Sequence, residues 1–290
     1  MSVRQVSAAF QGARGAFSED ACRQVLPGRD VRYVPCEKFF DVFSMLQAGG
    51  VDYAVIPIEN TLHGSVHENY DYLLQFKPPI VAETQVRIVH NLIGRPESKL
   101  EDIERAISHP VALAQCVDFF REHPSIRVQS HYDTGGSVKT VMEGSDPRLA
   151  AVASTGAAEL YGAKVLRHEI EDDRENYTRF FLLDGRGAGP PRKGPGSKTS
   201  LVFVTTNEPG ALFKCMSAFA LRDINLTKIE SRPLKGRPFE YRFYVDVLAS
   251  PDEVNCANAM RHLEELTEFL AVLGCYTPAS GPVQVPEASG

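Results

Sequence analysis

The sequence predicts an α/β protein built from two parts, and three observations support this. In residues 1–184, short β-like runs alternate with segments of helical periodicity, which is typical of α/β architectures with a mainly parallel sheet. Residues 185–197 are rich in glycine and proline, which disfavours both helix and strand. After this stretch the order of β runs and helical segments becomes βαββαβ, the order of a ferredoxin-like unit.

In the N-terminal part, the expected strands are Val6–Phe10, Tyr53–Ile58, Ile126–Ser130, Leu149–Ala153 and Phe180–Leu183. Helical spacing relates two further sets of residues, Phe39, Phe43 and Leu46, and Val111, Gln115 and Phe119. Pro110 is expected to begin the second helix, where its missing N–H costs nothing. Ligands of such folds bind beyond the carboxyl ends of strands, so polar residues there are the first candidates for a site.

In the C-terminal part, the expected strands are Thr199–Thr205, Asn225–Glu230, Glu240–Leu248 and Phe269–Cys275. The two expected helices begin at Pro209 and span about Asp252–Leu266. The predicted organisation is an N-terminal domain, an exposed linker, a C-terminal domain and a disordered tail. Their boundaries are 1–184, 185–198, 199–276 and 277–290.

Composition excludes several function classes. The net charge of the 290 residues is -6 and no basic stripe occurs, so nucleic acid is not an expected partner. No apolar run approaches the roughly 20 residues needed to span a membrane, and residues 1–10 do not resemble a signal peptide. The six scattered cysteines are typical of reduced, buried thiols. We therefore expect a cytoplasmic protein without membrane association.

Metal and phosphate motifs are weak. His63 and His67 are four residues apart, but Gly64 lies between them and no third ligand follows at a telling distance, so no metal site is expected. The chain also contains no phosphate-binding glycine fingerprint. The segment Gly12–Glu19 leads from a strand into a helix that Ser18 could cap, and that helix start could hold an anion.

Four polar clusters follow β runs or begin helices. They are residues 56–66, residues 108–110 with Gln115, residues 133–137, and residues 176–180. Each cluster alone is better explained as a cap or a turn. Together they offer hydroxyl, amide and guanidinium groups without an obvious pair of nucleophile and base. Such a set suits a reaction that needs orientation, anion binding and one proton donor.

In this order the motifs resemble the prephenate dehydratase family over nearly the whole chain. They are Gly-x-x-Gly-Ala-Phe-Ser-Glu at 12–19, Ile-Pro-Ile-Glu-Asn at 56–60, Ser-His-Pro at 108–110 followed by Gln115 and Cys116, and Thr-Arg-Phe at 178–180. The C-terminal part resembles an ACT regulatory domain through residues 207–212 and 230–233. The resemblance implies a two-lobed catalytic domain, similar to type II periplasmic binding proteins, plus a ferredoxin-like ACT domain.

The implied reaction removes carbon dioxide and the ring hydroxyl from prephenate, giving phenylpyruvate for L-phenylalanine biosynthesis. It needs no cofactor or metal. The resemblance assigns the catalytic positions to Thr178, Arg179 and Phe180, with Thr178 donating to the departing hydroxyl. Arg179 is a candidate for a substrate carboxylate contact, and its alternative is a structural ion pair with Glu171, Asp172 or Asp173.

The resemblance also assigns substrate-binding positions. They are Glu59, Asn60, Thr61, Ser108, Gln115 and Thr134. A carboxylate at Glu59 would repel a dianionic substrate unless it were protonated or paired, so its alternative role is to hold the loop. Thr61 replaces a common family serine and keeps the hydroxyl. Residues 133–139 depart from the usual Ser-Thr-x-x-Ala pattern and lean towards the plant-type arogenate dehydratases.

For the ACT part, the resemblance implies L-phenylalanine as an allosteric effector, bound between ACT domains of a homodimer or homotetramer. The implied effector residues are Asn207, Gly210, Ala211, Leu212, Glu230 and Ser231. A helix-start glycine is the alternative for Gly210. Two rival functions stay open. One is an arogenate dehydratase that yields phenylalanine directly, and the other is an inactive, amino-acid-sensing binding protein. A periplasmic receptor is disfavoured because no export signal is found.

Overall fold

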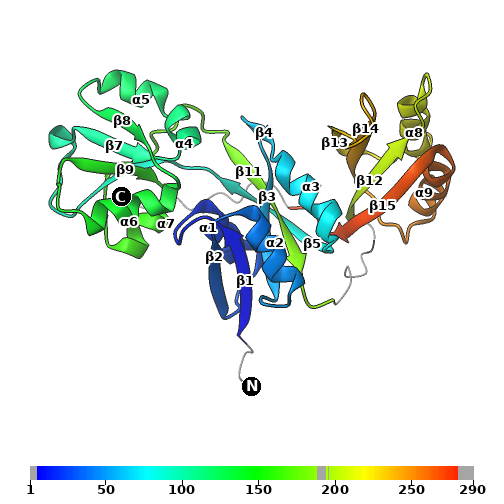
Figure 1. Cartoon of the computed structure of the whole chain (residues 1–290), viewed down its shortest axis with the longest axis horizontal. Coiled ribbons are helices and arrows are strands. Elements are labelled where there is room, and N and C mark those ends of the chain that lie inside the picture. Colours follow the sequence, from blue (N-terminus) through cyan, green and yellow to red (C-terminus); the bar gives the residue numbers. More distant parts are fainter. Residues whose placement is uncertain (1–4, 188–193, 195, 280–290) are drawn as a thin grey trace.

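The computed structural model describes residues 5–187, 194 and 196–279. Half of the expected linker, residues 188–193 and 195, and the expected tail from residue 280 onward lie outside the described residues. Figure 1 shows three bodies in a row, with a lobe of residues 91–167 at one end and the C-terminal domain at the other. The central lobe contains the first strand of the chain and the last strand before the glycine-rich stretch.

The central lobe, called lobe 1, is built on a mixed sheet in the order β5-β11-β3-β1-β2. Its strands are β1 (Val6–Gln11), β2 (Val31–Cys36), β3 (Tyr53–Asn60), the short β4 (Gly64–Ser65), β5 (Ile80–Arg87) and β11 (Tyr177–Asp184). Its helices are α1 (Phe17–Val25), α2 (Phe39–Gln47) and α3 (His67–Phe76). The α1 side packs on Phe10 and Phe180, and the α2 and α3 side on Ile56 and Phe181.

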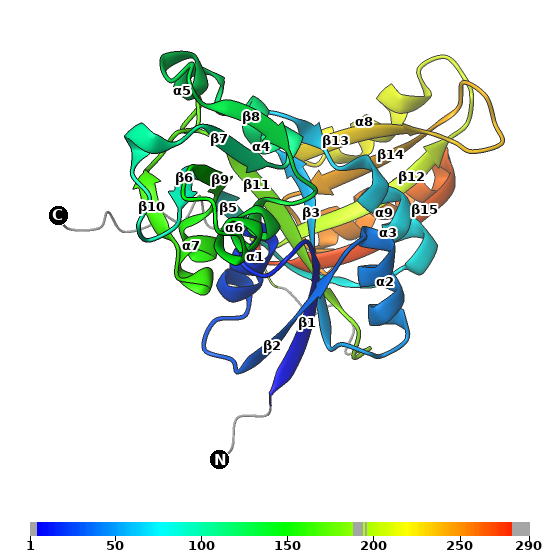
Figure 2. The same cartoon turned by 60° about the vertical axis from the view of Figure 1, so that its left-hand side comes forward.

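Lobe 2 is a five-stranded sheet in the order β10-β6-β9-β7-β8. Its strands are β6 (Asn91–Gly94), β7 (Arg105–Ser108), β8 (Arg127–Ser130), β9 (Leu149–Ala153) and β10 (Lys164–Arg167). Its helices are a 3-10 turn at Leu100–Asp102, α4 (Pro110–Ala114), α5 (Val117–Glu122), α6 (Thr134–Glu143) and α7 (Thr155–Tyr161). Phe119 and Val138 belong to clusters on opposite faces of this sheet. Figure 2 shows this lobe from the front.

The structure confirms the expected α/β lobes and corrects three details. The sheets are mixed rather than mainly parallel, because β11 runs antiparallel to both β3 and β5. The single helix expected around Gln115 is two short helices, α4 and α5, which are interrupted at Gln115 and Cys116. In α1 the N-cap is Ala16, which forms no side-chain cap, so Ser18 does not cap this helix.

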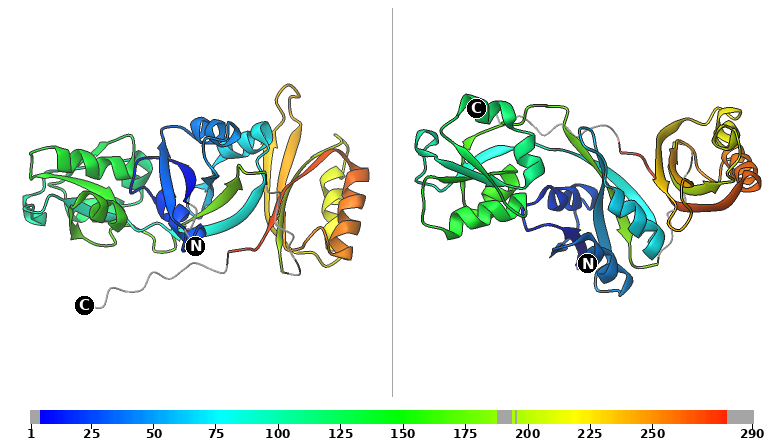
Figure 3. Two further views of the ribbon diagram at one scale, coloured as in Figure 1. Left: turned by 90° about the horizontal axis from the view of Figure 1, so that it is seen from below. Right: turned by 45° about the horizontal axis from the view of Figure 1, so that its top comes forward.

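The C-terminal domain has the predicted βαββαβ order. Its elements are β12 (Lys198–Thr205), α8 (Ala211–Ala220), β13 (Leu226–Pro233), β14 (Tyr241–Val247), α9 (Val254–Leu266) and β15 (Thr267–Tyr276). The sheet order is β13-β14-β12-β15 and all its pairs are antiparallel. Figure 3 shows α8 and α9 on the outer side of this sheet, away from the rest of the chain.

The C-terminal sheet continues into lobe 1. Strand β15 pairs in parallel with β5 through Gly274 and Ile80, which makes one sheet of ten strands. Tyr276 and Tyr244 belong to the same buried cluster as Ile80 and Phe181. The two domains therefore share a core in spite of the glycine-rich stretch between them. No helix of the described residues is long and apolar enough to cross a membrane.

Gly274 tests this junction, because a Cβ atom there would overlap the carbonyl oxygen of Ile80. We expect Gly274→Ala to lower the free energy of unfolding by about 1–3 kcal/mol, the usual cost of overpacking. Urea unfolding measures the change. Gly194→Ala is the control, since a Cβ at Gly194 meets no atom within 4 Å. Equal unfolding midpoints for the two variants would contradict the close approach of the strands.

Candidate functional site

The carboxyl ends of parallel strands from both lobes face each other. The turn after β1 packs against the starts of α6 and α7, and a Cβ on Gly135 would lie 2.8 Å from the carbonyl oxygen of Arg14. The Ser154 hydroxyl donates to the carbonyl of Gly15 at 3.0 Å, and Tyr161 donates to the carbonyl of Arg14 at 3.2 Å. Glycines at this contact let the two backbones approach closely. The lobes are therefore held together beside the predicted site.

Thr178 and Asn60 form the centre of the candidate site. They are paired residues on the neighbouring strands β11 and β3. The Asn60 side-chain amide donates to the Thr178 hydroxyl oxygen at 3.0 Å, and also to the side-chain oxygen of Asn176 at 2.8 Å. Because Thr178 accepts this bond, its own hydroxyl proton can be donated elsewhere.

The orientation of the Asn60 amide is fixed by its other end. The Asn60 Oδ1 atom accepts from the backbone N–H groups of Leu62 at 2.9 Å and His63 at 3.0 Å. An amide oxygen can accept both bonds, whereas an NH2 group in that place could accept neither. The turn after β3 thus directs the amide nitrogen of Asn60 towards Thr178.

Thr61 joins the two sides of this turn through its hydroxyl. Its Oγ1 donates to the carbonyl of Glu175 at 2.7 Å and accepts from the N–H of Tyr177 at 3.0 Å. These backbone bonds hold the start of β11 beside the end of β3. The structure therefore uses the Thr61 hydroxyl to position the strand that carries Thr178.

Gln115 of lobe 2 contacts the segment of the chain that joins β5 to β6. Its Oε1 atom lies 2.8 Å from Nε2 of His90, a buried residue between β5 and β6. Burial lowers the pKa of His90 although Gln115 opposes the shift, so the neutral ring donates to the amide oxygen. The Gln115 amide nitrogen is then available to another acceptor.

Ser108 and Thr134 occupy the carboxyl edge of the lobe 2 sheet. Ser108 ends β7 and is buried, and its hydroxyl donates to the carbonyl of Val152 at 2.6 Å. Thr134 is the first residue of α6, where Asp133 caps the helix by accepting from Gly136. Among the described residues no hydrogen bond is formed by the Thr134 hydroxyl. Within the described residues, the Ser108 hydroxyl therefore already donates a hydrogen bond, whereas the Thr134 hydroxyl forms none.

Arg179 lies on the opposite face of β11 from Thr178 and is almost completely buried. Its guanidinium forms ion pairs with three carboxylates: Glu59 at 2.8 Å, Glu83 at 3.0 Å and Asp246 at 2.7 Å. This arrangement is the structural ion pair rather than an open carboxylate-binding group. The expected partners were wrong, because Glu171 pairs with Arg87, and Asp172 and Asp173 accept backbone N–H groups.

Glu59 is paired, which removes the repulsion that a free carboxylate would exert on an anionic substrate. It contacts Arg179 and also Lys228 of the C-terminal domain. Burial alone would raise the pKa of Glu59, but these two cations lower it below its usual value. Burial would likewise lower the pKa of Arg179, while Asp246 and Glu59 raise it, so both groups are charged at neutral pH.

Phe180 is buried in the core between β11 and α1, where it packs on Val55 and Phe10. Sequence reasoning did not select Asn176 or His90 as site residues. Asn176 is completely buried, and its side-chain nitrogen has no hydrogen-bond partner within the described structure. Its place in the polar cluster of residues 176–180 was the sequence signal for it.

The residues predicted for the effector fall into two separate groups. Gly210 has a left-handed φ of 77° and is the N-cap of α8, with Ala211 and Leu212 in the first turn and Asn207 in the preceding loop. Glu230 lies on β13 and faces lobe 1, where it accepts from Ser65 at 2.6 Å. No hydrogen bond or ion pair of the described residues joins the two groups.

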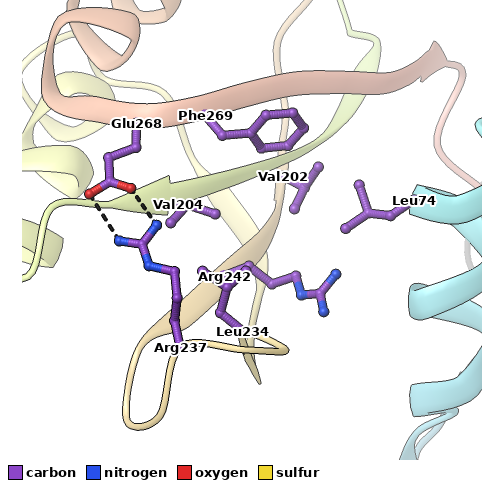
Figure 4. A pocket seen from close by; sticks show the side chains of 8 residues that line it. All are labelled: Leu74, Val202, Val204, Leu234, Arg237, Arg242, Glu268 and Phe269. Atoms are coloured by element: carbon purple, nitrogen blue, oxygen red, sulfur yellow. Dashed lines mark hydrogen bonds and ion pairs between the residues drawn. The ribbon is translucent and has the colours of Figure 1, made fainter.

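Two surface pockets lie away from Thr178. The first, of about 350 Å³, is lined by side chains of the C-terminal domain and by Leu74 of α3, as Figure 4 shows. In it Arg237 pairs with Glu268 at 2.6 Å. The second lies beside the 3-10 turn of lobe 2. Within the described residues, no group of three or more histidine, cysteine or acidic side chains could hold a metal ion.

Comparisons with known proteins identify the family of the chain. The sequence model of the prephenate dehydratase family matches residues 8–187. The chain therefore belongs to the prephenate dehydratase family. It is 43% identical over 281 residues to arogenate dehydratase/prephenate dehydratase 2 of Arabidopsis thaliana, a match that covers 94% of this chain and 73% of the relative.

Two solved structures are similar over nearly the whole chain. A prephenate dehydratase from Arthrobacter aurescens, in complex with L-Phe, has a TM-score of 0.85 and 33% identity, with 94% of this chain and 90% of that one covered. GqqA, described as a novel type of quorum quenching acylase, has a TM-score of 0.87 and 36% identity, with 94% and 98% covered. The chain is thus similar to these proteins in its C-terminal domain as well as in its lobes.

The expected cytoplasmic location is contradicted by these comparisons. The Arabidopsis relative and two others from the same plant are named as chloroplastic proteins. These names point to a plastid rather than the cytoplasm. The expectation failed because composition and reduced cysteines are common to proteins of both compartments.

Asn60→Asp tests the hydrogen bond to Thr178. The carboxylate can still accept from Leu62 and His63, but it presents an acceptor where the amide presented a donor. It would then compete for the Thr178 proton, so we expect turnover to fall by about 100-fold, the scale of losing one positioned donor. Steady-state dehydratase assays measure kcat. Activity equal to that of the parent would contradict the assigned direction of this bond.

Proposed function

We propose that Thr178 is the proton donor in the dehydration and decarboxylation of prephenate or arogenate by this chain. One observation carries the proposal: the Asn60 amide donates to the Thr178 oxygen at 3.0 Å, which leaves the threonine proton to face a substrate. Family membership supplies the reaction, since the chain is a dehydratase of phenylalanine biosynthesis. The geometry supplies the roles of the residues.

In the proposed mechanism, the ring carboxylate leaves as carbon dioxide and its bonding electron pair enters the ring. The carbon–oxygen bond to the ring hydroxyl breaks, and the departing hydroxide takes the proton of Thr178 to leave as water. The ring becomes aromatic, which drives the reaction. Negative charge then develops on the Thr178 oxygen, where the Asn60 N–H stabilises it. Solvent returns the proton to Thr178 after the products leave.

A threonine hydroxyl is a poor acid in water, so this role requires a preorganised site. Asn60 is fixed by the turn after β3, and Thr61 fixes the start of β11. Ser108, Gln115 and Thr134 are assigned to orient the substrate from lobe 2. Polar groups from both lobes can then hold the two carboxylates of prephenate in a reactive orientation. Arg179 supports this site by holding β11 and does not contact the substrate in this proposal.

Thr178→Ala is expected to lower kcat by at least ~100-fold, the usual scale for one acid or oxyanion contact. Thr178→Ser keeps a hydroxyl that can accept from Asn60, so it should retain far more activity than the alanine variant. Thr277→Ala, an exposed threonine change, is the control. Phenylpyruvate absorbance with prephenate measures the rates. A fully active alanine variant would exclude Thr178 from the mechanism.

The same assays decide between the substrates and the rival function. Arogenate carries an amino group where prephenate has a ketone, and the names of the curated relatives include both substrates. Phenylalanine formed from arogenate, measured beside phenylpyruvate formed from prephenate, gives the ratio of the two kcat/KM values. An inactive amino-acid sensor would turn over neither substrate.

We further propose that residues 199–276 form an ACT domain that binds L-phenylalanine and inhibits the enzyme. The left-handed Gly210 places exposed backbone N–H groups at the start of α8, which suits an amino-acid carboxylate. Among the described residues, no hydrogen bond or ion pair joins the predicted effector residues at the start of α8 to those on β13, which favours a site completed by a second copy. A homodimer or homotetramer follows from this proposal.

Millimolar phenylalanine is expected to lower turnover of the parent severalfold. Gly210→Val should weaken this inhibition while basal activity is retained, because a β-branched residue is strained at a φ of 77°. Gly236→Val places the same residue at a φ of 83° in the β13–β14 hairpin and is the matched control. Light scattering after size exclusion measures the oligomer. Equal rates with and without phenylalanine would oppose the regulatory role.

A further inference from the structure

The C-terminal domain sends charged side chains into the buried ion cluster around Arg179, Glu59 and Glu83. Lys198 on β12 contacts Glu83 at 2.7 Å, and two further side chains come from β13 and β14. Lys228 on β13 contacts Glu59, and Asp246 on β14 contacts Arg179 at 2.7 Å. Both are largely buried, with 11% of the Lys228 side chain and 7% of the Asp246 side chain exposed. A domain that served only for regulation at its outer surface would not need to place charges here.

We propose that Lys228 and Asp246 are positioning residues for the dehydration, so that the C-terminal domain completes the support of Thr178. The two side chains hold Glu59 and Arg179, and these hold the strands that carry Asn60 and Thr178. This inference rests on the proposed role of Thr178.

Strand pairing explains how the charges act on the site. Arg179 pairs with Glu59 and Thr178 pairs with Asn60 in the β11–β3 ladder. The register shifts between Arg179 and Phe180, so that Phe180 pairs with Pro57. A bulge of this kind re-aims the side chains beside it and weakens the ladder locally. The ion pairs lie at this irregularity, where the backbone alone fixes the strands least.

Charge balance explains why Lys228 and Asp246 are both needed. Arg179 and Lys198 share buried contacts with Glu83 and Asp246, which gives two cations and two anions. Lys228 pairs with Glu59 and, at 3.8 Å, with Glu230. Removing one partner of a buried ion pair leaves an uncompensated charge, which the structure can relieve only by moving. Loss of Lys228 would therefore displace Glu59, the residue that precedes Asn60.

The pH at which Glu59 takes up a proton is a readout that a merely structural role of Lys228 would not change. Charged or titratable groups surround it on every side: Arg179 from β11, Lys228 and Glu230 from β13, His67 and Tyr70 from α3, and Glu83 and Asp246 beyond Arg179. Burial raises the pKa of Glu59, and Arg179 and Lys228 lower it. Without Lys228, Glu59 takes up its proton at a higher pH, and the ion pairs are lost there.

The experiment compares Lys228→Met, Lys228→Arg and Lys235→Met in the full-length chain. Lys235 is an exposed lysine of the same domain and is the matched control. We expect Lys228→Met to lower kcat about 10-fold, the scale of one charge-assisted hydrogen bond, with KM nearly unchanged. The acid limb of its kcat–pH profile should move to higher pH. Lys228→Arg should restore both properties, and Lys235→Met should change neither.

Asp246→Asn is a second variant of nearly the same size, in case Lys228→Met does not fold. It should lower kcat with the same small effect on KM. Parent-like kcat and pH profiles in folded variants of both residues would overturn the inference while Thr178→Ala remained inactive. A parent-like Thr178→Ala would instead reject the proposed function. A lowered unfolding midpoint with an unchanged acid limb would assign Lys228 to stability alone and would also overturn the inference.

Discussion

The buried guanidinium of Arg179 is the constraint on which the other parts depend. It joins three strands and both domains, because its carboxylate partners come from β3, β5 and β14. A charge removed from water is tolerated only when it is paired, so these elements must meet in one arrangement. The shared core around Tyr276 and the close approach of Gly274 to Ile80 follow from the same junction.

The two faces of β11 have different roles because side chains alternate along a strand. Arg179 points to the ion cluster, and Thr178 points to the amide of Asn60. In the proposed mechanism, the ion cluster therefore sets the position of the threonine without touching the substrate. The glycine contacts between the turn after β1 and α6 join lobe 2 to lobe 1. Proton donation by a weak acid such as Thr178 requires both the ion cluster and the contact between the lobes in this mechanism.

Much of the site could be predicted from the sequence, but its division of labour could not. The motifs around Asn60, Ser108 and Thr178 were recognisable because they follow strands or begin helices. Arg179 was read as equally suited to a substrate contact or an ion pair. Its actual partners, Glu83, Asp246 and Glu59, lie 96, 67 and 120 positions away in the sequence. Periodicity carries no information about such distant pairs, so Glu83 and Asp246 were not foreseen.

The sequence by itself determined the α/β lobes, the βαββαβ order of the C-terminal domain and the family of the chain. These follow from local periodicity, turn residues and short motifs, which are properties of neighbours in the chain. Only the tertiary structure decided that the domains share one sheet, that Glu59 is paired, and that Lys228 and Asp246 reach the site. These depend on charges far apart in sequence that become stable in the interior only when folding places them together.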